Sequence, residues 1–177
     1  MYRFINAIGF QLGWLACIAS VRYDQEISAL LFSSVLVGLH FLYSPTPLRD
    51  LKLSLIVFVL GVLVDSSLQY FSVISFYGWA LGPLSPFWLW MVWAMFALTL
   101  NYSLAFLQNR HWLVTSIAGL VFGPLSYIAG TKLGAASFNN TPIPMVILGI
   151  IWMLTLPALV SFCHKLHTPI EVTHDAP

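Results

Sequence analysis

Long apolar segments separated by short polar or Pro/Gly-rich breaks take up nearly all of the 177-residue chain. A helix needs about 20 mostly apolar residues to cross a bilayer, so each segment predicts one crossing. Because the breaks are short, consecutive helices are expected to pack as antiparallel neighbours. The pattern predicts an all-α fold, a polytopic transmembrane bundle of about six helices. These helices are expected at residues 5–21, 27–43, 53–77, 86–107, 112–130 and 143–163.

The first two segments leave an alternative open. Arg22, Asp24 and Glu26 lie close together between them, which would also suit a hairpin that does not cross the membrane. Six crossings are favoured because each segment approaches spanning length when it tilts. The whole chain, residues 1–177, is then expected to form a single integral membrane domain with a flexible tail at 166–177.

The composition excludes several other classes of protein. Only 7% of the residues are charged and the mean hydropathy is +0.88, whereas soluble domains carry roughly a quarter charged residues. The net charge of +1 and the absence of clustered Lys and Arg argue against a nucleic-acid partner. Membrane lipid is the expected partner, with other membrane proteins as a further candidate.

The distribution of basic residues predicts the orientation. Loops rich in Lys and Arg remain on the cytoplasmic side of a membrane. With six crossings, two basic residues fall on one side, Arg22 and Lys132, and five on the other. Both termini lie on the side with five and are therefore expected in the cytoplasm. The five residues are Arg3, Arg49, Lys52, Arg110 and Lys165.

Asp65 is the first candidate for chemistry, because it lies inside the apolar third segment. A charge at the centre of a membrane helix costs on the order of 3 kcal/mol, so Asp65 is expected to face the bundle interior. Helical spacing places it in one stripe with Gly61 and Gln69. Two interpretations stay open: a site for a proton, cation or polar headgroup, or a structural hydrogen-bonding group between helices.

The fifth segment contains a motif for close packing and a helix-breaking residue. Gly119 and Gly123 form a G-x-x-x-G pair that lets another helix approach. Pro124 removes one backbone donor, so a kink or a solvated pocket is expected there. At 1.5 Å per residue, Asp65 and Tyr127 lie about 18 and 22 Å from the cytoplasmic edge, and so they can meet.

These residues define a candidate intramembrane polar pocket. In it, a neutral Asp65 is expected to donate a hydrogen bond to a carbonyl freed by Pro124. Asn101, the one amide on a small-residue face of the fourth segment, is a further member, although packing alone explains that face well. The candidate pocket residues are Asp65, Gln69, Asn101, Ser126 and Tyr127.

No cofactor or metal is expected. The sequence lacks the zinc, diiron, phosphate-loop and nucleophile-elbow motifs. The pair His164 and His167 has helical spacing, but a metal site needs three or four converging ligands. Cys17 and Cys163 are expected near opposite ends of their helices, far beyond the ~7 Å limit for a disulfide.

The segments "FWLWMVWAMFALTLNYSLAFL" and "GLVFGPLSYIAGTKLGAASF" carry a resemblance to a known family. With its Trp-rich fourth helix and Gly-Pro-Leu-Ser-Tyr-x-x-Gly-x-x-Leu-Gly-Ala segment, the chain resembles a family of small bacterial inner-membrane proteins catalogued as a domain of unknown function. The motif-bearing part covers residues 86–138. The resemblance implies a location in the bacterial inner membrane and a role in membrane-lipid metabolism or envelope stress, and it assigns no catalytic residues.

Three functions are compatible with these features of the sequence. The favoured one is a non-enzymatic accessory protein that binds lipid in the pocket near Asp65. The second is a small proton-coupled transporter, which the buried carboxylate favours but the lack of an internal repeat disfavours. The third is an integral-membrane lipid-modifying enzyme with Asp65 and Tyr127 as acid and base.

Overall fold

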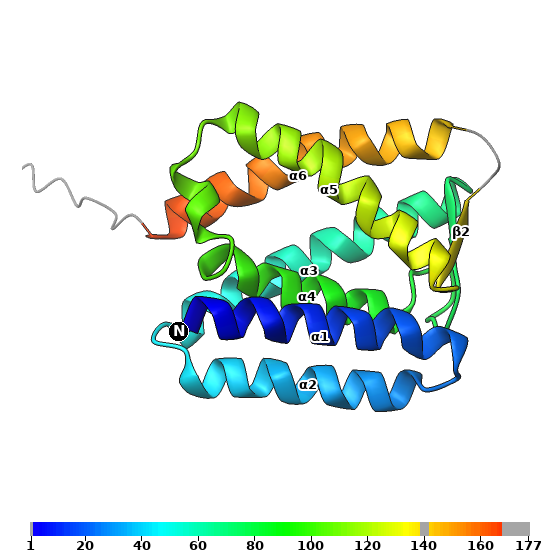
Figure 1. Cartoon of the computed structure of the whole chain (residues 1–177), viewed down its shortest axis with the longest axis horizontal. Helices are drawn as coiled ribbons and strands as arrows, with labels where there is room; N and C mark the ends of the chain where they lie inside the picture. Colours follow the sequence, from blue (N-terminus) through cyan, green and yellow to red (C-terminus); the bar gives the residue numbers. More distant parts are fainter. Residues whose placement is uncertain (1, 139–141, 168–177) are drawn as a thin grey trace, which may run out of the picture.

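Six α-helices form a bundle in the computed structural model, which describes residues 2–138 and 142–167 (Figure 1). The chain folds as three consecutive helical hairpins, and the middle hairpin packs against both of the others. The predicted all-α helix bundle is confirmed. Its helices are α1 (Tyr2–Arg22), α2 (Glu26–Tyr43), α3 (Pro47–Tyr70), α4 (Phe87–Asn101), α5 (Trp112–Lys132) and α6 (Ile143–His167).

Five of these six helices are long and apolar enough to cross a membrane. Both α1 and α2 are among them, with 21 and 18 residues, so each of the first two segments is long enough to cross, which favours two crossings over a non-crossing hairpin. Helix α4 has 15 residues and is therefore about 22 Å long, shorter than a hydrocarbon core of about 30 Å. The length and apolar character of the other five helices identify a multi-pass membrane protein.

Helix α3 ends earlier than the apolar pattern predicts. Ser72 has a φ of 54°, in the left-handed region, and the Val73 N–H donates to the Leu68 carbonyl at 2.9 Å. This arrangement caps the helix and turns the chain away from its axis. The residues that follow form a short strand, β1 (Ile74–Phe76), so the prediction of one helix over 53–77 is wrong at its C-terminal end.

Strand β1 pairs antiparallel with β2 (Ala136–Phe138), and Ser75 lies opposite Ser137. The two strands follow α3 and α5, so they tie the middle hairpin to the last one at the end of the bundle away from the termini (Figure 1). Helix α5 ends in the same manner as α3. Gly134 has a φ of 85°, and the Ala135 N–H donates to the Gly130 carbonyl at 2.9 Å.

Helix α4 also ends before its predicted limit at residue 107. The Leu104 N–H donates to the Thr99 carbonyl at 2.7 Å, and the chain continues as a short 3-10 helix, η1 (Ala105–Asn109). Asn101 is therefore the last residue of α4 rather than a residue within a longer helix. The Asn101 amide therefore lies at the end of α4, and not within the helix as predicted.

Helix α1 begins and α6 ends at the same end of the bundle (Figure 1). Helices α1, α3 and α6 carry four of the five basic residues of the predicted cytoplasmic group near their ends on this side, and the fifth, Arg110, lies between η1 and α5. Arg22 and Lys132 lie in the last turns of α1 and α5, at the opposite end. The two groups of basic residues are thus separated by the length of the bundle. The tail that was expected to be flexible falls mainly on residues 168–177, outside the described residues.

The G-x-x-x-G pair of α5 packs against α6. A Cβ atom at Gly119 would clash with the backbone carbonyl of Trp152, and one at Gly123 would clash with the Trp152 side chain. Only glycine allows this close approach of the two helices. Helix α5 is continuous through Pro124.

Candidate functional site

Two tryptophan rings connect four helices at the centre of the bundle. The Trp93 ring of α4 lies directly against Gly61 of α3, where any Cβ atom would clash with it. On α6, the Trp152 ring stacks on Trp93 with centroids 5.2 Å apart and planes 8° apart, and it also contacts Gly123 of α5. Such an aromatic pair contributes about 0.5–1.5 kcal/mol beyond its buried area. The glycines therefore allow the indole pair to form.

Asp65 lies one helical turn after Gly61 and is fully buried. Its Oδ2 accepts a hydrogen bond from Trp93 Nε1 at 2.5 Å, and its Oδ1 accepts one from the Tyr127 hydroxyl at 2.6 Å. The carboxylate thus faces the bundle interior and links α3 to α4 and α5. It does not have the expected role of a donor to a carbonyl freed by Pro124, because both of its oxygens accept hydrogen bonds.

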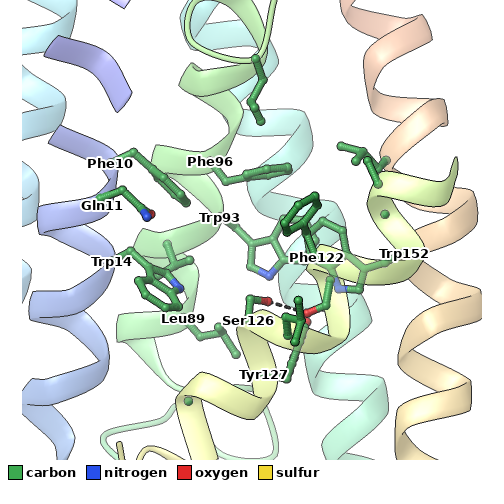
Figure 2. Close-up of a pocket in the computed structure, with 18 of the residues that line it drawn as sticks. Phe10, Gln11, Trp14, Leu89, Trp93, Phe96, Phe122, Ser126, Tyr127 and Trp152 are labelled. Atoms are coloured by element: carbon green, nitrogen blue, oxygen red, sulfur yellow. Dashed lines mark hydrogen bonds between the residues drawn. The ribbon is translucent and has the colours of Figure 1, made fainter. Parts of the chain in front are cut away.

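A cavity of about 610 Å³ lies between α1 and α4 on one side and α5 and α6 on the other (Figure 2). It forms because α5 packs along α6 and stands away from α1 and α4. The lining side chains are mostly aromatic and aliphatic. Those from the two sides include Phe10, Trp14, Leu89, Trp93, Phe96, Phe122 and Trp152.

The polar groups of the cavity wall are few and uncharged. No Asp, Glu, Lys, Arg or His lines it, and the polar side chains other than indoles are Gln11, Ser126 and Tyr127. Figure 2 shows Ser126 and Tyr127 side by side on α5, facing the α4 side of the cavity. Asp65 is not among the lining residues, since it lies behind the ring of Trp93 and the hydroxyl of Tyr127.

The predicted pocket residues are therefore only partly brought together. Ser126 and Tyr127 line the cavity, and Asp65 supports the wall from behind. The Gln69 side chain points elsewhere, because its Nε2 donates to the Leu84 carbonyl at 3.4 Å in the loop before α4. Asn101 is bonded to a different carboxylate. It is the last residue of α4 and does not line the cavity.

That second carboxylate is Asp50, a buried residue that the sequence analysis missed. It is fully buried in the first turn of α3 and has donors from three other parts of the chain. Burial raises the pKa of the Tyr102 hydroxyl above its usual value, so this donor stays protonated at neutral pH. The four donors are Ser44 Oγ at 2.6 Å, Asn101 Nδ2 at 2.6 Å, Tyr102 Oη at 2.7 Å and His40 Nε2 at 3.1 Å.

The two cysteines lie in separate surroundings. Cys17 Sγ is 3.3 Å from Ser33 Oγ, between α1 and α2, whereas the Cys163 thiol donates to Asn101 Oδ1 at 2.7 Å. They are not bonded to each other, as their predicted positions required. Over the described parts of the chain, no three His, Cys, Asp or Glu side chains converge as a metal site would require.

The fold and this site define a class of protein: a multi-pass membrane helix bundle with an apolar cavity that is partly open at the side of the bundle. Residues 3–158 match the family described as a protein of unknown function (DUF2878), and the chain belongs to that family. The match extends well beyond residues 86–138, which carry the motifs of the resemblance. Neither the curated proteins nor the solved structures contain a match to the chain.

Proposed function

We propose that the protein binds the apolar chain of a membrane lipid in the cavity between α1, α4, α5 and α6, as an accessory to membrane-lipid metabolism or the response to envelope stress. The observation that carries this proposal is the size and lining of the cavity. Its volume of about 610 Å³ falls within the range of roughly 300–1,000 Å³ typical of ligand sites. Its wall is almost entirely apolar and lies within helices that suit a bilayer.

Several lining residues also reach the outer surface of the bundle. Phe122 on α5 is 69% exposed and Phe106 on η1 is 53% exposed, and both line the cavity. On a membrane protein, apolar side chains in such positions face lipid tails. A lipid chain therefore has a lateral route between the hydrocarbon core and the cavity that crosses no polar layer.

The surroundings of Asp65 favour binding over catalysis. The enzyme hypothesis requires Asp65 and Tyr127 to act on a substrate as acid and base, and such groups must lie within hydrogen-bond reach of it. Asp65 does not line the cavity, and its two oxygens already accept from Trp93 and Tyr127. A proton-coupled transporter is favoured less for the same reason, because no charged side chain lines the cavity.

The proposal includes a location and an orientation. Five basic residues at one end of the bundle against two at the other support cytoplasmic termini. The resemblance to bacterial inner-membrane proteins supports the inner membrane as the location.

The direct test fills the cavity with a side chain. Gly130 lines the cavity, and a Cβ atom there would meet nothing within 4 Å, so Gly130→Leu places a large apolar group in open space. Gly38→Leu is the matched control, because Gly38 is a helical glycine with the same free space but lies outside the cavity lining.

Lipids that co-purify with each variant would be measured by mass spectrometry. We expect a defined lipid at a near-constant ratio to protein with the wild type and Gly38→Leu, and its loss with Gly130→Leu. The same lipid profile from all three proteins would reject the proposal.

A further inference from the structure

We infer that the occupant of this cavity is an uncharged lipid chain that carries a hydroxyl group, and that this hydroxyl donates a hydrogen bond to the wall formed by Ser126 and Tyr127. The inference rests on the proposed function and specifies the chemical class of the ligand. Two observations carry it: the lack of charge in the cavity wall and the direction of the hydrogen bonds that Ser126 and Tyr127 already make.

The lining excludes a charged group inside the cavity. An ion moved into an apolar site needs a partner of opposite charge or several hydrogen bonds to offset its lost hydration. No side chain of the lining supplies a charge, and the nearby carboxylate of Asp65 is bonded to Trp93 and Tyr127. The headgroup of a phospholipid and the carboxylate of a fatty acid are therefore not accommodated within the cavity.

The hydroxyls of Ser126 and Tyr127 are left as acceptors. A hydroxyl has one proton to donate and two lone pairs that accept. Tyr127 uses its proton on Asp65 Oδ1 at 2.6 Å, and Ser126 uses its proton on the Gly123 carbonyl at 2.7 Å. Ser126 and Tyr127 thus have lone pairs but no free proton, whereas Trp152 Nε1 in the same wall is a buried donor without a hydrogen-bond partner among the described residues. The complementary ligand group is therefore uncharged and both donates and accepts a hydrogen bond. In a lipid, that group is a hydroxyl.

Asp65 is the positioning residue in this scheme, because it decides which way the Tyr127 proton points. In Asp65→Asn, the side-chain carbonyl still accepts from Trp93, but the amide donates to the Tyr127 oxygen. The Tyr127 proton is then free to turn toward the cavity. This variant should favour a ligand that accepts a hydrogen bond, such as a ketone, over one that donates.

Tryptophan fluorescence can report occupancy, because four of the seven tryptophans line the cavity: Trp14, Trp88, Trp93 and Trp152. The protein would be placed in dioleoyl-phosphatidylcholine bilayers and titrated with dibrominated C18 probes whose bromine atoms quench indole fluorescence. The probes differ only at one end and are an alkane, a primary alcohol, a methyl ketone and a carboxylate. The quenching that Gly130→Leu removes and Gly38→Leu retains is assigned to the cavity.

We expect the alcohol to bind the wild type roughly fivefold more tightly than the alkane, because about one net hydrogen bond contributes a free energy of that size. The carboxylate should bind most weakly of the four probes. Ser126→Ala and Tyr127→Phe should each reduce this preference, and Asp65→Asn should shift it toward the ketone. Thr131→Val is the matched control on α5, since the Thr131 hydroxyl also bonds to a carbonyl of its own helix but does not line the cavity.

The outcomes separate this inference from the proposed function. Equal affinity for alcohol and alkane, or tightest binding of the carboxylate, would overturn the hydroxyl inference and leave lipid binding in place. If no probe shows quenching that depends on Gly130, both the hydroxyl inference and the proposed lipid binding fail. Ser126→Ala keeps the test decisive if Tyr127→Phe does not fold, because the Ser126 hydroxyl bonds only within its own helix.

The hydroxyl has two possible sources, a free long-chain alcohol and a phospholipid whose acyl chain is hydroxylated. A brominated phosphatidylcholine with a hydroxyl on one acyl chain, compared with the same lipid without it, distinguishes them. A preference for the hydroxylated phospholipid would identify its acyl chain as the source of the hydroxyl group. A preference confined to the free alcohol would identify a long-chain alcohol as the source, and either result supports the hydroxyl inference.

Discussion

At the scale of single residues, Asp65 stabilises the bundle through two hydrogen bonds that only an acceptor can receive. Trp93 Nε1 is always a donor, and Tyr127 donates to the other oxygen. Removing the acceptor leaves both donors buried without partners, and each such group costs about 1–3 kcal/mol. Asp65 is therefore a structural hydrogen-bonding residue, in addition to the positioning role proposed for it.

The variant Asp65→Leu should accordingly lower the free energy of unfolding by about 2–6 kcal/mol, the sum of the two unpaired donors. The variant Asp65→Asn should lower it by less, because it can still pair with both Trp93 and Tyr127. Thermal unfolding of the purified variants in detergent, followed by near-UV circular dichroism, measures the difference. Equal midpoints for Asp65→Leu and the wild type would show that these hydrogen bonds contribute no stability.

Residue-scale prediction from the sequence succeeded for Asp65 and Tyr127 and failed for Asn101 and Asp50. Counting 1.5 Å per residue along two uninterrupted helices placed the first pair at similar depth, and the two side chains are hydrogen-bonded. Asp50 lies just after two prolines, in a segment that the pattern predicts to be a loop, where a carboxylate is ordinarily hydrated. Its burial depends on donors from α2, α4 and the loop between α2 and α3, which no local pattern shows.

At the scale of secondary-structure elements, the hydrophobic pattern located all six helices but not the ends of α3 and α4. The residues after Tyr70 remain largely apolar, so the pattern continues through the left-handed turn at Ser72 and into β1. A three-residue strand gains its backbone hydrogen bonds from β2, which is about 60 residues away in the sequence. A local pattern contains no information about that partner.

The contact between α5 and α6 gives an element-scale prediction. In Gly119→Val, the added side chain meets the backbone carbonyl of Trp152, which cannot move aside without shifting α6. Overpacking of this kind typically costs 1–3 kcal/mol. We expect a lower unfolding midpoint for Gly119→Val and little change for the control Gly38→Val, where the same side chain meets open space.

Thermal unfolding in detergent compares Gly119→Val with Gly38→Val directly. Both substitutions replace a helical glycine by the same β-branched residue, so the intrinsic helix preference cancels between them. If the two variants unfold at the same temperature, the close approach of α5 and α6 is not supported. A lower midpoint only for Gly119→Val supports the packing role that the G-x-x-x-G pair predicts.

At the scale of the whole molecule, the order of the helical hairpins follows from short connections, whereas the cavity does not. Short loops make neighbours in sequence neighbours in space, and the three hairpins have that arrangement. The cavity depends on how far α5 stands from α1 and α4, and the stacked rings of Trp93 and Trp152 form part of its wall. The sequence shows these residues as ordinary members of apolar segments.

The orientation of the whole molecule in the membrane is the last prediction. The five basic residues at the end where α1 begins and α6 ends predict that this end faces the cytoplasm, because positively charged loops are retained there. Alkaline phosphatase is active only outside the cytoplasm. It should therefore be inactive when fused after Pro177 and active when inserted after Gly82, an exposed position at the opposite end with free space around it.

Green fluorescent protein at the same two positions should give the reverse pattern, since it folds well in the cytoplasm and poorly when exported through the general secretion route. Active phosphatase after Pro177 with fluorescence at Gly82 would invert the bundle. The Asp50 cluster of His40, Asn101 and Tyr102 would then lie near the outer face instead of near the cytoplasmic one. The cavity would keep its lateral route to lipid in either orientation, because that route runs through the side of the bundle, past Phe106 and Phe122.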